Sequence, residues 1–522
     1  MKKKTNPLQK ARIFRIVFAC VWIVLITLPF VFVSKRSSAI GRVILKTQFG
    51  PSVMGALSGS VIALAVLLLM TLAFGRVYCS FLCPLGIWQD VAGRIAGIFK
   101  NRKQRRTHYT RPLNWLRYVI LGLVIGFLVF GISYPFAFLD PYSIYGRFAS
   151  QLFGNAAKGI GNLLSGIFPY SIGIRHFANF QVWSFVVAVF LFCLVTLMSS
   201  FGGRIYCNSI CPVGSLLSII SPVSMFRLEI DESKCKHCML CQMNCKSHCI
   251  DSKISKIDYS RCVVCFDCAD SCTSDAFAFK FTWGSKKRKV PTDGKLVSGG
   301  EKPADPAFRK TLIALGTGIA SAAAVSVIAK ATGGKSKPAF GENEIADGSL
   351  PAGIVPPGGK SILHIKNNCT ACQACISACP NEIIKPAVGQ YGIEGFMMPI
   401  ISYDHGFCDY DCHSCSTVCP SGAIERTTLD EKRKIQIGEV RFNAKNCLVI
   451  KEGIDCGNCS RHCPTGTIKL VTLTNGRLFP HITRESLDTC IGCGACEYVC
   501  PADPKGMTVI PKSVQTVASK IN

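Results

Sequence analysis

Six segments of the chain repeat one arrangement of four cysteines, and this repeat limits what the chain can fold into more than any other feature. In each regular segment two residues separate the first three cysteines, and the fourth follows after three more. Two segments lengthen the first gap, to three and to eight residues. Six sets of four account for 24 of the 31 cysteines. They are Cys235, Cys238, Cys241 and Cys245; Cys262, Cys265, Cys268 and Cys272; Cys369, Cys372, Cys375 and Cys379; Cys408, Cys412, Cys415 and Cys419; Cys447, Cys456, Cys459 and Cys463; and Cys490, Cys493, Cys496 and Cys500.

This spacing is typical of cysteines that bind four-iron, four-sulfur clusters. Three thiolates on a tightly looped backbone can each bind one iron of a cubane. A structural zinc site instead uses two separated cysteine pairs, and an odd number of cysteines excludes a fully paired disulfide framework. We therefore predict six [4Fe–4S] clusters, with these 24 cysteines as the metal ligands.

The fourth cysteine of each motif is expected to bind the neighbouring cluster, as in two-cluster ferredoxins. By that rule Cys272 completes the site of the first motif, and Cys245 completes the site of the second. Spacing leaves the pairing among the four later motifs open. Cys249, four residues after Cys245, is interpreted as a free thiol.

The apolar content indicates an integral membrane protein. Hydrophobic residues make up 49% of the chain, charged residues only 17%, and the mean hydropathy is +0.32, which excludes a disordered or nucleic-acid-binding tail. A helix needs about 20 apolar residues to cross a bilayer. Four uncharged segments have that length, and a fifth, rich in Ala, Gly and Ser, is either a span or a buried soluble helix. They are residues 16–33, 53–74, 118–138, 182–201 and 311–329.

The positive charge predicts which side of the membrane each part occupies. The formal net charge is +28, part of which the negative charge of bound clusters would neutralise. Lys and Arg gather at the N-terminus and in residues 76–117, and basic loops stay in the cytoplasm. Residues 235–272 are therefore expected in the cytoplasm. Residues 369–500 are expected in the periplasm if 311–329 crosses the membrane.

A second, different repeat follows two of the apolar segments. The pattern Gly-Arg-x-Tyr-Cys-x3-Cys-Pro-x-Gly occurs at residues 75–86 and again at 203–214, which implies an internal duplication. Cysteines four apart share a helix face, so Cys79, Cys83, Cys207 and Cys211 could converge on one site. A redox pair, a metal site and a structural helix stop remain open for them. Cys20 and Cys193 lie in apolar segments and are expected to be core thiols.

The predicted fold class is an α-helical membrane domain plus α+β ferredoxin-like domains, one with two clusters and one with four. The expected organisation runs in chain order: a four-span membrane domain, a two-cluster ferredoxin domain, a basic linker, the fifth span or export-signal-like segment, a linker and a four-cluster domain. Their bounds are 1–222, 223–283, 284–310, 311–330, 331–361 and 362–522.

On these motifs the chain resembles a fusion of two accessory proteins of periplasmic nitrate respiration. Residues 1 to about 283 resemble the NapH type, with four spans, two Cys-x3-Cys-Pro motifs and a two-cluster tail. Residues from about 308 resemble the NapG/MauM type, a polyferredoxin that is normally exported folded. The Phe-Arg-Lys-Thr-Leu sequence at 308–312 also resembles a twin-arginine export signal, with Arg-Lys in place of Arg-Arg.

The resemblance implies an electron-transfer subunit of the bacterial inner membrane, with quinol dehydrogenase activity as its enzyme-level form. Electrons would pass from the quinone pool to a periplasmic redox partner such as a reductase, and no nucleic acid takes part. Relatives with the same four-span core serve nitrous oxide reduction and copper handling, so reduction or maturation of a metal such as copper is the alternative function. A docking subunit whose clusters are mainly structural is a third.

Overall fold

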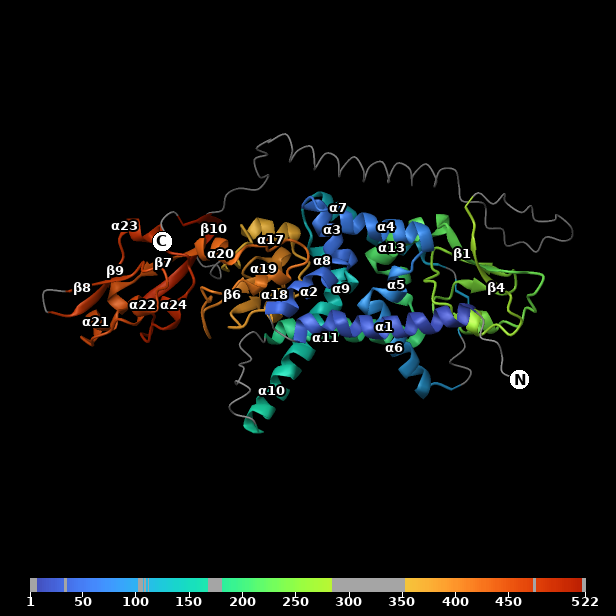
Figure 1. The fold of residues 1–522 in the computed structure, drawn as a ribbon, viewed down its shortest axis with the longest axis horizontal. Coiled ribbons are helices and arrows are strands. Elements are labelled where there is room, and N and C mark those ends of the chain that lie inside the picture. Colours follow the sequence, from blue (N-terminus) through green and yellow to red (C-terminus); the bar gives the residue numbers. More distant parts are fainter. Residues whose placement is uncertain are drawn as a thin grey trace, which may run out of the picture.

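The computed structural model describes residues 7–31, 35–101, 107, 109–110, 112–167, 181–283, 353–472 and 476–518. A bundle of helices occupies the middle of an elongated molecule, and ferredoxin-like parts lie at its two ends (Figure 1). The predicted fifth segment, 311–329, lies outside the described residues, as do the basic linker 284–310 and the second linker up to residue 352. Residues 353–361, predicted as the end of that linker, are instead packed into the C-terminal part, where Ile354 forms a β-bridge with Ile401.

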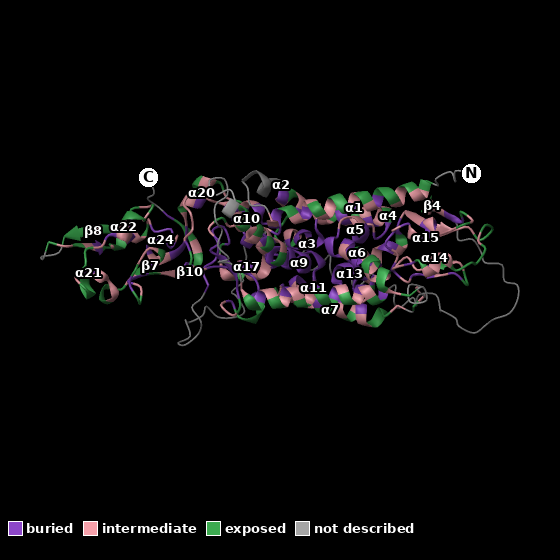
Figure 2. Cartoon of the chain, turned by 90° about the horizontal axis from the view of Figure 1, so that it is seen from below, coloured by how far each residue is buried: buried purple, intermediate pink, exposed green. Residues whose placement is uncertain are grey.

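Long and short helices alternate in the bundle. Its elements are α1 (Pro7–Val31), α2 (Lys35–Lys46), α3 (Phe49–Leu57), α4 (Ile62–Phe74), α5 (Tyr78–Phe81), α6 (Pro84–Phe99), α7 (Asn114–Val129), α8 (Tyr134–Leu139), α9 (Pro141–Phe148), the π-helix η1 (Ala149–Gly154), α10 (Asn155–Ile167), α11 (Val182–Gly202), α12 (Ile205–Ser209) and α13 (Pro212–Ile220). Buried residues concentrate among the short central helices, while α1 and α11 expose one face each (Figure 2).

Only two of the four predicted spans form single helices long and apolar enough to cross a membrane. These are α1, with 25 residues, and α11, with 21. The segment 53–74 is broken between α3 and α4, where Gly59 has a φ of +106°. Helix α4 therefore has 13 residues and α7 has 16, or about 20 and 24 Å at 1.5 Å per residue. Uninterrupted spans over 53–74 and 118–138 were wrong predictions, because an apolar run does not reveal a turn inside it.

The part after the bundle is a small ferredoxin-like unit with its own core. Its outer strands β1 (Phe226–Ile230) and β4 (Phe277–Phe281) pair antiparallel, with Phe226 opposite Phe281. Two short strands, β2 (Ile250–Asp251) and β3 (Lys256–Ile257), and two one-turn helices, α14 (Leu240–Met243) and α15 (Asp267–Asp270), carry the two cysteine motifs between them. We call residues 226–281 the N-terminal ferredoxin.

The part from residue 353 onward divides into two halves. The first half shares one continuous hydrophobic core with the helical bundle, whereas the second has a separate core around Val440 and Met507. The elements are α17 (Ile362–Asn368), α18 (Ala374–Ser377), β5 (Ile384–Pro386), β6 (Pro399–Ile401), α19 (Ser414–Val418), α20 (Leu429–Lys434), β7 (Ile435–Phe442), α21 (Leu448–Lys451), α22 (Asn458–Arg461), β8 (Lys469–Thr472), β9 (Leu478–His481), α23 (Arg484–Leu487), α24 (Ala495–Tyr498) and β10 (Met507–Val517). The strands pair antiparallel as β5–β6, β7–β10 and β8–β9. We call residues 353–518 the C-terminal polyferredoxin.

Candidate iron–sulfur sites and a buried cysteine quartet

Five cavities are each lined by cysteines from two different motifs. Each encloses about 310 to 390 Å³ of space between atoms, open solvent at the mouth included. Among the described residues, no three His, Cys, Asp or Glu side chains converge as tightly as a single metal ion requires. Wide cavities with thiols on their walls fit a multi-iron cluster better than one zinc ion.

The lining cysteines show how the motifs cross. The first motif shares its cavity with Cys272, and the second with Cys245, which are the two sets that the crossing rule predicts. The sequence left the later pairing open, and the structure joins the third motif with the fourth and the fifth with the sixth. The sets are Cys379, Cys408, Cys412 and Cys415; Cys447, Cys456, Cys459 and Cys500; and Cys463, Cys490, Cys493 and Cys496. A sixth set, formed by Cys369, Cys372, Cys375 and Cys419, consists of mutually interacting thiols.

The four regular motifs share a backbone conformation that explains their spacing. In each, the second and fourth residues after the first cysteine have positive φ, between 47° and 81°. Six of these eight residues are not glycine, and such conformations are uncommon for L-residues and gather at functional sites. In the two lengthened motifs, His413 and Gly457 follow the second cysteine with φ of −135° and −155°. The longer first gap lets the backbone reach the cavity without the left-handed turn.

The environment of the thiols indicates that they need a bound cation. Burial raises the pKa of Cys241 and of Cys459 to about 11 and the pKa of Cys493 to about 12. As bare thiols they would be protonated at neutral pH, whereas metal binding requires thiolates. The positive charge of iron supplies the stabilisation that burial removes, so the donor set fits iron–sulfur clusters.

Cys249 adds a fifth sulfur to one site. It is buried, its Sγ lies 3.5 Å from that of Cys245, and it lines the cavity of the second motif. Its hydrogen bond to Cys245 is the main cause that lowers the pKa of Cys245 to about 7. The thiol is unpaired, and its closeness to a predicted cluster ligand is not evident from its place outside the motif.

The duplicated motifs bring Cys79, Cys83, Cys207 and Cys211 together at the centre of the bundle. We call these four residues the cysteine quartet. Each is at most 3% exposed, all belong to one core cluster, and the thiols of Cys83 and Cys211 both interact with Cys207 and Cys79. The prediction that each pair shares one helix face was wrong. Cys79 lies in α5, and Cys83 caps the N-terminus of the separate helix α6.

The arginine and the last glycine of the duplicated pattern make matching contacts in its two copies. The arginine of one copy reaches the other: Arg76 donates to the Cys207 carbonyl at 3.0 Å, and Arg204 donates to that of Cys79. The last glycine leaves room for the first cysteine, because a Cβ at Gly86 would lie 2.3 Å from the Cys79 oxygen. Gly214 stands in the same relation to Cys207, at 2.2 Å. The two copies therefore form one interlocked unit with approximate twofold symmetry.

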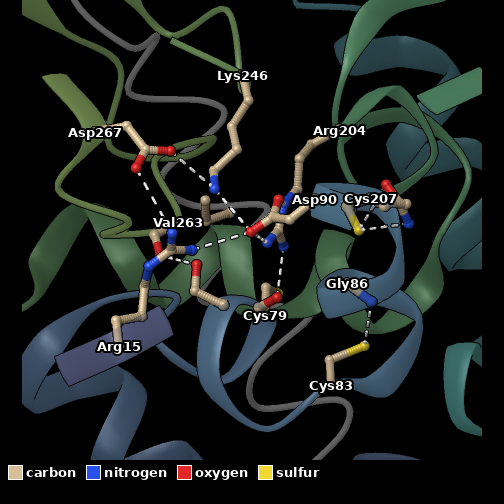
Figure 3. Close-up of polar contacts among 12 residues, drawn as sticks. Arg15, Cys79, Cys83, Gly86, Asp90, Arg204, Cys207, Lys246, Val263 and Asp267 are labelled. Atoms are coloured by element: carbon tan, nitrogen blue, oxygen red, sulfur yellow. Dashed lines mark hydrogen bonds and ion pairs between the residues drawn. The ribbon is translucent and has the colours of Figure 1, made fainter. Parts of the chain in front are cut away.

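An ion network joins this unit to the N-terminal ferredoxin (Figure 3). Asp90 on α6 binds Arg204 at 2.9 Å, Lys246 at 2.7 Å and Arg15 at 3.0 Å. Lys246, which follows Cys245, also binds Asp267 at 3.0 Å. Burial alone would raise the pKa of Asp90, but the three cations hold it well below its usual range. Ser80 adds a neutral contact, donating to the Val263 carbonyl at 2.5 Å.

Sequence reasoning missed the acidic residues beside the quartet, although the sequence carries a signal for them. Asp90 and Asp140 are the only acidic residues among the first 222; Asp140 is fully buried within the bundle, and the side chain of Asp90 is 11% exposed. A rare acid in a basic, apolar segment is costly to bury unless a partner or a function retains it. By contrast, Cys20 and Cys193 are exposed on α1 and α11, so the prediction that they are core thiols was wrong.

The comparisons with known proteins agree with these sites. A family described as a 4Fe-4S binding domain matches residues 56–106 and 184–229, the segments that hold the two Cys-x3-Cys-Pro motifs. A family described as a 4Fe-4S dicluster domain matches residues 407–467 and 452–503. No solved structure matches the chain.

Three characterised relatives are all named ferredoxin-type proteins. NapG of Escherichia coli is 30% identical over 166 residues, which are 30% of this chain and 71% of NapG. NapF of the same organism is 27% identical over 149 residues, 28% of this chain and 80% of NapF. The methylamine utilization protein MauN of Paracoccus denitrificans is 28% identical over 188 residues, 35% of this chain and 52% of MauN. With these matches and its cysteine-lined cavities, the chain is an iron–sulfur electron-transfer protein that belongs to the ferredoxin-type family of NapG.

Proposed function

We propose that the protein carries electrons from a quinol, through six [4Fe–4S] clusters and the cysteine quartet, to a redox partner in the periplasm. One observation carries the proposal. The ferredoxin-like parts lie at the two ends of the helical bundle (Figure 1), each part holds cysteine-lined sites, and the four further cysteines are buried in the core of the bundle. A cluster supplies one-electron transfer, and the protein supplies its position and surroundings.

The surface of the bundle supports a place in the membrane. Large apolar side chains are exposed along four of its helices, α1, α4, α7 and α11, and soluble monomers rarely expose apolar patches of that extent. Examples are Val21 on α1, Leu69 on α4, Phe127 on α7 and Phe190 on α11. Lipid is the solvent that suits this surface, and in the proposed arrangement the two ferredoxin parts lie on opposite sides of the membrane. We assign the N-terminal ferredoxin to the cytoplasm and the C-terminal polyferredoxin to the periplasm, in a bacterial inner membrane.

The burial of the quartet argues against the copper alternative. A cargo ion must enter and leave its site, yet the four thiols are at most 3% exposed and sit within the bundle's core. An electron needs no such opening. A disulfide within the quartet would accept two electrons and two protons to become two thiols and would return them on oxidation. The quartet is therefore better suited to pass electrons between the ends than to take up a metal from solution.

Iron analysis with a matched pair of cysteine variants tests the cluster content. Six sites predict roughly 24 iron and 24 acid-labile sulfide per chain after anaerobic purification. The variant Cys245→Ser should lose about one cluster, roughly four iron. Cys249→Ser, in the same cavity, should keep the wild-type content. Equal losses in the two variants would reject the assigned ligand set, and stoichiometric zinc in place of iron would reject the clusters.

Reduction by quinol tests the electron donor, and a topology reporter tests the sidedness of the C-terminal polyferredoxin. A reduced quinol analogue, added anaerobically to the full chain in lipid vesicles, should bleach the cluster absorbance and produce a paramagnetic signal. A reporter active only in the periplasm, fused after Asn522, should be active. Clusters that dithionite reduces but no quinol does would overturn the donor. A silent periplasmic reporter beside an active cytoplasmic one would overturn the sidedness.

A further inference from the structure

A buried carboxylate lies where the bundle meets the C-terminal polyferredoxin. Asp140 is 0% exposed and precedes α9, where its Oδ2 accepts from the amide of Ser143 at 2.9 Å and from its hydroxyl at 2.8 Å. Its other oxygen, Oδ1, is buried and has no hydrogen-bond partner. Gly50 on α3 makes room for the group, since a Cβ there would lie 2.4 Å from Oδ2. Capping a helix needs only one of the two oxygens, so the second is left unexplained.

On one side, Asp140 faces the duplicated motifs. Its charge acts on Tyr78 and on Tyr206, the residues that directly precede Cys79 and Cys207. The Tyr206 hydroxyl donates to the carbonyl of Leu139, the residue next to Asp140, at 2.6 Å. The carboxylate is therefore placed symmetrically with respect to the two halves of the quartet.

On the other side, the helix that Asp140 caps packs on a cluster motif. Tyr142, two residues after Asp140, is 0% exposed, and the charge of the Cys372 thiolate acts on it. Gly146 lies so close that an added Cβ would be 2.7 Å from the Cys372 carbonyl oxygen. The eight-residue helix α9, whose N-terminus Asp140 caps, thus packs directly on the motif that supplies Cys369, Cys372 and Cys375 to this site.

The surroundings of Asp140 bring the pKa of its carboxyl close to neutral pH. Burial raises its pKa, the hydrogen bonds from Ser143 and the guanidinium of Arg147 oppose the rise, and the result is about 6. The titratable groups that face it are Arg147, Tyr142, Tyr78 and Tyr206. Arginine and tyrosine ordinarily keep their charge state between pH 5 and 8. Within this group, only the carboxyl can exchange a proton in that range.

We propose that Asp140 is a redox-linked proton acceptor for the neighbouring site. It takes up one proton when the site of Cys369, Cys372, Cys375 and Cys419 gains one electron, and it releases the proton when the electron leaves. This inference rests on the proposed function, in which a quinol supplies the electrons and releases two protons for every two electrons. Protonating the carboxylate cancels the negative charge that the electron brings into the interior, where such charge is poorly screened.

The linkage gives a specific pH dependence. Below about pH 6 the carboxyl is protonated in both redox states, so the reduction potential of this site should not vary with pH. Above pH 6, reduction carries a proton with it. For one proton per electron, each tenfold drop in proton concentration then lowers the potential by up to about 59 mV.

Potentiometric titration of the full, cluster-loaded chain with dithionite, followed by EPR from pH 5.5 to 8.5, tests the inference. One of the cluster potentials should be flat below pH 6 and fall above it. Asp140→Asn should abolish the slope while an Asn oxygen still caps α9. The control, Asp404→Asn, removes a carboxylate whose side chain is 69% exposed and screened by water, and it should leave the slope intact.

Two results would overturn the inference: a wild-type potential that is independent of pH above 6, or a slope that persists in Asp140→Asn. If that variant does not assemble, the wild-type slope still decides, together with infrared difference spectra, which should show a carboxyl protonated on reduction. Dithionite delivers electrons without any quinol. Normal titration with no reduction by quinol would therefore reject the proposed function alone, and reduction by quinol with a flat potential would reject the Asp140 inference alone.

Discussion

The two ends of the bundle are attached to their ferredoxin parts by different kinds of contact. At the N-terminal ferredoxin, buried charges meet: Asp90 binds Lys246, and Arg15 lies 3.6 Å from Asp267. At the C-terminal polyferredoxin the contacts are mostly neutral. Gln151 donates to Gln373 at 2.9 Å, Gln373 donates to Ser184 at 3.0 Å, and Ser377 donates to Ser150 at 2.8 Å.

This difference shows how each joint, the contact between the bundle and one ferredoxin part, is stabilised. The N-terminal ferredoxin has its own core, and an ion network forms part of its contact with the bundle, so single charged groups matter strongly. The first half of the C-terminal polyferredoxin shares the bundle's core, so its attachment is spread over many packed atoms. A buried charge left without its partner costs several kcal/mol, whereas a lost neutral hydrogen bond costs about 1 kcal/mol.

The largest effect should come from cutting the connection between the ends. In the double variant Cys79→Ser, Cys207→Ser, quinol should no longer reduce the clusters, because in the proposed function the quartet is the redox-capable group between the two ends. Serine keeps the size of the side chain, so the iron content and membrane insertion should match the wild type. Quinol reduction is measured by stopped-flow absorbance. A wild-type rate in the double variant would show that the motifs are structural helix stops.

The next effect should come from removing the centre of the charged joint. Asp90→Ala leaves Arg204 and Lys246 without their buried partner, and we expect the N-terminal ferredoxin to dock more weakly by about 3–5 kcal/mol. Hydrogen exchange of residues 246–270 measures this loss as faster amide exchange. The matched control is Glu394→Ala, which breaks the more exposed Lys366–Glu394 pair at the other end and should cost less than about 1 kcal/mol. Similar losses in the two variants would erase the contrast between the joints.

A smaller effect should follow from overpacking the contact between the bundle and the C-terminal polyferredoxin. Gly146→Ala would place a methyl group 2.7 Å from the Cys372 oxygen and 3.1 Å from Phe30, and overpacking of this kind costs about 1–3 kcal/mol. Gly161→Ala on α10 meets nothing within 4 Å and, as a helix-favouring change, should be neutral or stabilising. Exchange at residues 369–379 reports the difference. If the two alanine variants behaved alike, close packing of α9 on Cys372 would not hold the joint.

The chemistry of the chain could be predicted from its sequence to a greater extent than its architecture. Cluster spacing is a local property, because three cysteines and two residues with positive φ lie within seven positions of one loop. The exchange of Cys245 and Cys272 between the first two sites follows from the rule that the fourth cysteine of a motif binds the neighbouring cluster. The pairing of the later motifs depends on which loops fold together, and spacing carries no record of that.

The helical part was harder to predict because hydropathy measures composition and not shape. Both Val53 and Phe74 lie in one apolar run, yet the chain turns between α3 and α4. The interlocking of Arg76 with Cys207 is likewise invisible until the two copies of the motif are placed face to face. Asp90 and Asp140 stand out as the only acids of the first 222 residues, but what they bind depends on helices far apart in sequence.

The smallest expected effect concerns an ion pair that crosses the joint with the C-terminal polyferredoxin. Lys158 on α10 lies 2.8 Å from Glu382, with side chains 13% and 10% exposed. Glu382→Gln should weaken docking of residues 369–379 by about 1 kcal/mol, because the Gln oxygen can still accept a hydrogen bond from Lys158. The two side chains are nearly buried, so raising the salt concentration from about 0.15 M to about 1 M should reduce this loss only in part. Glu425→Gln breaks the exposed Lys360–Glu425 pair within the polyferredoxin and should not change docking at either salt concentration. A loss as large as that of Asp90→Ala would mean that this joint, too, depends on charge.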